Sequence, residues 1–258
     1  MERLTVNNET PRGLNAAMLR TWGYLFILLG AAGRGFIQNG MLGLANATTQ
    51  EILAVLETSE NGMLWVTLSL ILQAMEACAV PIFALLLVEG FCHTSNLKMY
   101  ALRIALVAVA SEVPYNLAFS GNVLELNTRN PVFALLLGLL VLWFYRHYGE
   151  KNTQNTVIKV VATLASVLWC QMLGIEHGAF ILLMVAVLWV TRGKKMRTLV
   201  GCIAAACSTV FSLFNVASPM SFLAIHFYNG EKGEPNRIFN LICYPAILLV
   251  MGLAAMYI

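Results

Sequence analysis

The chain has 258 residues, of which 59% are hydrophobic and only 11% are Asp, Glu, Lys or Arg. A soluble domain carries roughly 25% charged residues, so this composition excludes an ordinary soluble protein. The formal net charge is +3, and the Lys and Arg residues fall in short clusters between apolar runs, which excludes nucleic acid as a partner. All 13 acidic residues are Glu, so any carboxylate chemistry uses Glu.

Long apolar runs predict an all-α fold, a polytopic bundle of transmembrane helices that forms a single integral membrane domain over residues 1–258. A bilayer core about 30 Å thick needs roughly 20 apolar residues in a helix, and a helix pairs its own backbone polar groups. We expect about eight spans, and the sequence leaves open whether 156–191 crosses fully. The spans are 16–44, 64–89, 99–119, 131–147, 156–172, 176–191, 197–217 and 236–257.

The distribution of Lys and Arg predicts that both termini are cytoplasmic, with the chain in the cell (inner or plasma) membrane. In this orientation the outer side receives only Arg129, Lys232 and Arg237, and Arg34 lies inside the first span. Membrane lipids are then the surrounding partner. The inner set is Arg3, Arg12, Arg20, Lys98, Arg103, Arg146, Lys151, Lys159, Arg192, Lys194, Lys195 and Arg197.

Polar side chains inside the spans mark candidate sites, because a charge near the bilayer centre costs about 3 kcal/mol on insertion scales. We expect them to line a shared polar cavity. The alternative is a set of interhelical hydrogen bonds and one structural ion pair, Arg34 with Glu76 or Glu112. The candidates for binding substrate are Arg34, Gln38, Asn39, Tyr115, Asn116, His226, Tyr228 and Asn229.

The six cysteines lie in or beside apolar segments and form no CxxC pair, which predicts free thiols rather than a disulfide framework. The four His residues are not at metal-ligand spacing, so we expect no metal site. No P-loop, HExxH or GxSxG motif of a soluble enzyme is present.

Several motifs in a fixed order resemble the signature of the TraX family of membrane proteins. They are VPIFALLLVEGF at 80–91, HTSNLKMY at 93–100, SEVPYNLAF at 111–119, NPVFALLLGLL at 130–140, FYNGEKG at 227–233 and CYP at 243–245. The resemblance covers about residues 65–258. It implies an acyltransferase, since the family is named for N-terminal acetylation of F-pilin and is similar to multi-span enzymes that take acyl-CoA from the cytosol.

The resemblance also assigns positions. The positions that match are Glu89, His93 and Asn96 in the motif of the second helix and Glu112, Pro114 and Tyr115 in that of the third. Asn130 matches the start of the fourth helix, and Tyr228, Asn229 and Gly230 match the late motif. The first span departs from the pattern. TraX relatives commonly carry an Asp-His pair there, whereas this chain has Gln38 and Asn39, whose amides do not titrate.

Acyl transfer from a thioester needs a base for the acceptor, donors for the oxyanion and a place for the acyl donor. We expect His93 to be the base, with Glu89 one turn back and Glu112 also catalytic. The donor is expected to be acetyl-CoA or another acyl-CoA, and the acceptor a peptide N-terminus or another small amine or hydroxyl compound. The residues expected to hold the donor are Asn96, Lys98, Lys194, Lys195 and Arg197.

Two alternatives remain open. The absent Asp-His pair is compatible with a non-catalytic membrane subunit that binds a peptide or a membrane protein partner. A transporter or lipid-handling protein is the third possibility, although no internal repeat supports a transporter built from two halves.

Overall fold

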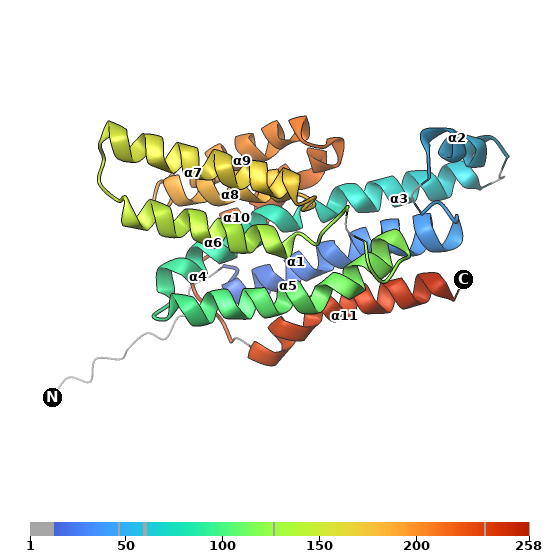
Figure 1. The fold of residues 1–258 in the computed structure, drawn as a ribbon, viewed down its shortest axis with the longest axis horizontal. Coiled ribbons are helices and arrows are strands. Elements are labelled where there is room, and N and C mark those ends of the chain that lie inside the picture. Colours follow the sequence, from blue (N-terminus) through green and yellow to red (C-terminus); the bar gives the residue numbers. More distant parts are fainter. Residues whose placement is uncertain (1–12, 46, 59–60, 126, 235, 258) are drawn as a thin grey trace, which may run out of the picture.

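A computed structural model describes residues 13–45, 47–58, 61–125, 127–234 and 236–257. Apart from two isolated β-bridges, these residues form helices, turns and loops, and the long helices lie side by side in a bundle (Figure 1). In chain order the helices are α1 (Ala16–Ala31), η1 (Ala32–Met41), α2 (Thr49–Thr58), α3 (Gly62–Glu76), α4 (Ala79–His93), α5 (Leu97–Ser120), α6 (Val132–His147), α7 (Thr153–Met172), α8 (Gly178–Val190), α9 (Arg197–Cys207), η2 (Ser208–Val210), η3 (Leu213–Met220), α10 (Ser221–His226) and α11 (Arg237–Met256).

Five helical runs among the described residues are long and apolar enough to cross a bilayer. They are Ala16–Met41, Gly62–His93, Leu97–Ser120, Thr153–Met172 and Ile238–Met256. These runs confirm an all-helical membrane protein and coincide with five of the predicted spans. The predicted span 176–191 forms the shorter α8, whose 13 residues extend only about 20 Å. The expected count of eight crossings is therefore not confirmed.

The segment from Arg197 to Glu231 enters the bundle and returns to the same end. At its start, Nη1 of Arg197 lies 3.3 Å from Oε1 of Glu89 at the end of α4. At its end, the backbone of Leu14 donates to Phe227 O and accepts from Asn229 N, beside the start of α1. The predicted crossing at 197–217 is therefore wrong, because this segment forms a re-entrant hairpin.

The tip of the hairpin lies near the middle of the bundle. There the Cys78 thiol, between α3 and α4, donates to the carbonyl of Ala217 at 3.0 Å. Buried polar side chains supply further partners: the Asn215 amide donates to Ser208 O at 3.0 Å, and the Ser218 hydroxyl donates to Ala205 O at 3.2 Å. Irregular backbone is tolerated at this depth because it is buried in protein and its carbonyls are paired.

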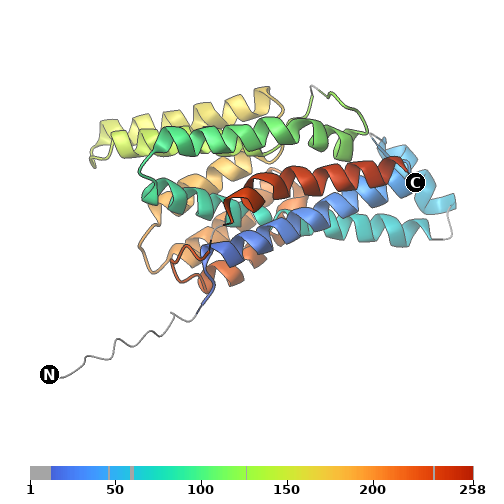
Figure 2. The same ribbon diagram turned by 90° about the horizontal axis from the view of Figure 1, so that it is seen from below.

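The start of α1 and the end of α11 lie at opposite ends of the bundle, and the two views agree (Figures 1 and 2). This differs from the expectation that both ends of the chain lie on one side. The hairpin is the physical reason, because it replaces one crossing by an entry and a return. Of the residues used for the predicted orientation, Arg3 and Arg12 lie outside the described residues, as does the side chain of Arg237.

Cationic side chains gather where α4 ends, and we call this end of the bundle, with Arg20, Arg146, Arg192 and Arg197, the basic end. The guanidinium of Arg146 lies 5.5 Å from the ring centroid of Phe91. That of Arg192 donates to the Cys92 sulfur at 2.9 Å and lies 4.0 Å from the ring centroid of Trp189. The hairpin also brings Lys232 here, which was expected on the outer side.

Candidate functional site

The last turn of α4 presents the central side chains of the basic end. Gly90 permits the turn to pack closely against α5, because a Cβ at this position would lie 2.5 Å from the hydroxyl of Tyr100. The helix continues through Gly90 and ends at His93. Asn96 then caps α5, accepting a hydrogen bond from Met99 N at 3.1 Å. This local structure directs Glu89 and His93 to one face, as their four-residue spacing predicts.

Glu89 links the histidine to a cation from another helix. Nδ1 of His93 lies 2.8 Å from the Glu89 backbone carbonyl and 3.8 Å from the Glu89 carboxylate. The same carboxylate pairs with Arg197 at 3.3 Å, and both of these side chains are about one-fifth exposed, whereas His93 is 74% exposed. The pair therefore anchors α9 to α4 and holds a negative charge beside an accessible imidazole.

Tyr228 lies close to this pair, on the connection between α10 and α11. Burial raises the pKa of its phenol above the usual range, the Glu89 carboxylate adds to this, and Arg197 and Arg20 oppose it. The phenol therefore remains protonated near neutral pH and can donate a hydrogen bond. The returning hairpin brings Tyr228 to the basic end.

Most of the remaining residues predicted to bind the acyl donor lie around the same end and are exposed. Two residues predicted to bind substrate also lie here: His226 stacks edge-on against Phe227, and the side-chain carbonyl of Asn229 accepts a hydrogen bond from Glu231 N at 2.9 Å. The structure thus brings part of the predicted substrate set to the predicted donor set. The exposed residues are Asn96, Lys98, Lys194, Lys195 and His226.

Arg34 belongs to a second, separate cluster. Its Nη1 lies 2.6 Å from Oε1 of Glu176, and its guanidinium lies 4.9 Å from the ring centroid of Phe119. The predicted pairing of Arg34 with Glu76 or Glu112 is therefore wrong. Glu76 lies nearby, since its carboxylate would meet a Cβ placed at Gly30 and the charges of Arg34 and Glu176 act on it.

Arg34 lies on the π-helix η1, which joins its neighbours through polar side chains. Gln73 donates from Nε2 to Gln38 Oε1 at 2.8 Å and to Ser69 Oγ at the same distance. Asn39 donates to the carbonyls of Ala118 and Phe119 in the last turn of α5, at 3.2 and 3.0 Å. These are hydrogen bonds between helices, as expected from the alternative to a shared polar cavity.

Glu112 belongs to a third cluster. It accepts from the side-chain amide of Asn130 at 2.6 Å and from its backbone N–H at 3.3 Å. Asn130 also donates to Ala108 O and is fully buried just before α6. Glu112 lies 15 residues along α5 from Leu97, about 22 Å of helix, so the structure does not bring it to His93.

The neighbours of Glu112 are buried rather than directed to a described pocket. Tyr115 and Asn116 are each 1% exposed, and neither the Tyr115 hydroxyl nor the Asn116 side-chain carbonyl has a hydrogen-bond partner among the described residues. Tyr115 stacks edge-on against Phe119. The structure therefore separates the predicted site residues into three clusters instead of one shared polar cavity.

Some contacts could not be identified from the sequence. Glu176 was missed because it lies in the turn between two apolar runs, although an unpaired Arg34 required an acidic partner at its own depth. Arg192 and Arg20 were read only as orientation signals. By contrast, the prediction of free thiols is confirmed for all six cysteines. Within the described ranges, no group of three His, Cys or Glu side chains is placed to hold a metal ion.

Comparison with known proteins places the chain in a family. The model of the family described as TraX protein matches residues 48–255, which run from α2 into the last turn of α11 and leave out α1 and η1. No curated protein matches significantly, and no solved structure does. The matched range contains Glu89, His93 and Tyr228. The chain therefore belongs to the TraX family.

Proposed function

We propose that this protein is a membrane acyltransferase that uses acetyl-CoA or another acyl-CoA at the basic end, with His93 as the general base. The acceptor is the amine or hydroxyl of a small compound or a peptide N-terminus. The supporting observation is the 2.8 Å contact between His93 Nδ1 and the Glu89 carbonyl. A carbonyl only accepts hydrogen bonds, so neutral His93 carries its proton on Nδ1 and keeps the Nε2 lone pair for the acceptor.

The groups around His93 suit the remaining steps. His93 takes a proton from the acceptor, whose nitrogen or oxygen attacks the thioester carbon. The new C–N or C–O bond forms, the C–S bond breaks, and CoA leaves as a thiolate that takes the proton from the imidazolium of His93. The Glu89 carboxylate, 3.8 Å away, stabilises the imidazolium that forms. The protonated phenol of Tyr228 is the proposed donor to the oxyanion.

Charge also favours this end for the donor. Exposed Lys98, Lys194 and Lys195 offer cations to the phosphates of CoA, and Asn96 lies two residues before Lys98, at the start of α5. The positive-inside rule directs such a cluster to the cytoplasmic face of the cell membrane, where acyl-CoA is available. We propose that location and orientation together with the activity.

The test measures release of the CoA thiol by purified protein with acetyl-CoA and a peptide that has a free N-terminus. We expect His93→Ala to lower turnover by about 10²- to 10⁴-fold, as for loss of a general base. His147→Ala is the matched control, because His147 is also exposed and ends a helix at the same end of the bundle. Turnover by His93→Ala equal to that of the control would reject His93 as the base.

A non-catalytic role is the second candidate. It is favoured by the place of Gln38 and Asn39, which stand where relatives commonly have a titrating pair and which hydrogen-bond to other helices. This role predicts no CoA release with any acyl-CoA tested and a membrane protein or peptide that co-purifies with both wild type and His93→Ala.

A further inference from the structure

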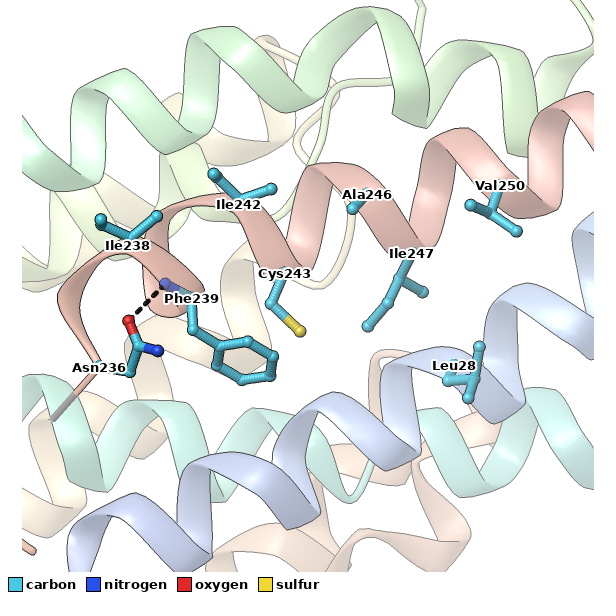
Figure 3. Close-up of a pocket in the computed structure, with 9 residues that line it drawn as sticks. All are labelled: Leu28, Asn236, Ile238, Phe239, Ile242, Cys243, Ala246, Ile247 and Val250. Atoms are coloured by element: carbon cyan, nitrogen blue, oxygen red, sulfur yellow. Dashed lines mark hydrogen bonds between the residues drawn. The ribbon is translucent and has the colours of Figure 1, made fainter. Parts of the chain in front are cut away.

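A groove of about 630 Å³ lies between α1 and α11. Phe239, Cys243 and Ile247 of α11 point toward α1, and Leu28 of α1 points back toward them (Figure 3). The wall is almost wholly apolar, and at its edge Val250 is 61% exposed. The groove is therefore open toward the surroundings of the bundle, which for these helices is the bilayer.

The length of the groove matches one leaflet. Eleven residues of α11 separate Phe239 from Val250, which corresponds to about 16 Å of helix. This is roughly half of the 30 Å hydrocarbon core. At its basic end the two helices are joined, because the Tyr24 hydroxyl donates to Asn240 O at 3.1 Å and the Tyr24 ring meets Phe239 edge-on. An extended acyl chain entering from the leaflet at the basic end fits these dimensions.

A cation without a protein partner lies at the mouth. Arg20, Tyr24 and Leu28 follow one another at four-residue steps, so they share the face of α1 that meets the groove. Arg20 is half-buried and forms no hydrogen bond or ion pair with any residue that the structure describes. The Tyr24 ring meets Phe239 of the groove wall, and Arg20 lies one turn before Tyr24 on the same face of α1, toward the start of this helix at the basic end.

We propose that this groove binds one anionic phospholipid, with an acyl chain along Leu28, Phe239 and Ile247 and the phosphate at Arg20. The apolar wall excludes a polar occupant, and the unpaired guanidinium selects an anionic headgroup over a zwitterionic one. The proposed lipid site uses neither His93 nor Glu89, so we expect His93→Ala to retain the lipid as wild type does.

Native mass spectrometry of the purified full chain tests the proposal, with phosphatidylglycerol and phosphatidylcholine of the same acyl chains as probes. We expect wild type to retain one phosphatidylglycerol at an about fivefold lower lipid concentration than phosphatidylcholine, the preference expected from one basic residue. Arg20→Gln should remove this preference. Lys151→Gln, which removes an exposed cation between α6 and α7, two helices that contribute no residue to the groove, should keep it.

A second pair of variants tests the groove itself. Ala246→Trp places a bulky side chain on the groove wall and should abolish retention of both lipids, whereas Leu249→Trp, on another face of α11, should not. Equal retention of the two lipids by wild type, or an unchanged preference in Arg20→Gln, would overturn the headgroup assignment. Wild-type retention by Ala246→Trp would overturn the place of the acyl chain.

Discussion

Arg34 carries a charge inside an otherwise apolar helical run, and Glu176 compensates it at 2.6 Å. Removing one partner leaves the other unpaired, whereas replacing both by apolar side chains removes the need for compensation. We therefore expect Arg34→Met to destabilise the protein by about 3 kcal/mol, and the double variant Arg34→Met, Glu176→Met to recover most of that loss. Denaturant unfolding in detergent measures both, and a double variant no more stable than the single one would contradict a structural pair.

At this scale the sequence predicted spacings better than partners. The four-residue step from Glu89 to His93 was enough to predict their contact, because a helix repeats nearly every four residues. The partner of Arg34 was not predictable in this way, since Glu176 is distant in the chain and the pairing depends on where the connection between α7 and α8 lies relative to η1. The burial of Asn130 against Glu112 likewise depends on packing between helices.

At the scale of elements, the hairpin from α9 to α10 is the main departure from the sequence-based prediction. Hydropathy identifies an apolar helix but does not show whether the chain turns back inside the bundle. The predicted span 197–217 ended where the short helices η2 and η3 reverse the direction of the chain. The sequence features that mark this reversal are the polar residues Ser208, Ser212, Asn215, Ser218 and Ser221. Most of them are buried and bond to backbone carbonyls, which is what irregular backbone needs at membrane depth.

The hairpin makes a prediction about sidedness. In a background without native cysteines, Lys195→Cys and Lys232→Cys should react with a membrane-impermeant maleimide from the same side, because both lie at the basic end. Arg129→Cys, at the turn that pairs with Ile175 after α7, should react only from the other side. If residues 195 and 232 reacted from opposite sides, the chain would have to cross the membrane between them, which would contradict the hairpin.

At the scale of the whole molecule, the sequence was sufficient for the class and the family but not for the path of the chain. Composition and apolar length predicted an all-helical membrane protein, and the motifs predicted the TraX family, because both depend on local patterns. The number of crossings and the relative positions of α1 and α11 depend on one reversal in the bundle interior. The shared polar cavity was predicted only from the depth of the polar residues in the membrane. In the structure, Arg34, Glu112 and His93 instead have separate partners.

Measuring turnover with acetyl-CoA on only one side of the membrane tests most directly whether the basic end receives the acyl donor. Protein reconstituted in one known orientation, established with the Lys232→Cys label, is supplied with membrane-impermeant acetyl-CoA on one side at a time, and CoA release is measured with the peptide acceptor present on both sides. We expect turnover only when acetyl-CoA is on the side of residue 232. Turnover only with acetyl-CoA on the opposite side, or none from either side, would contradict it.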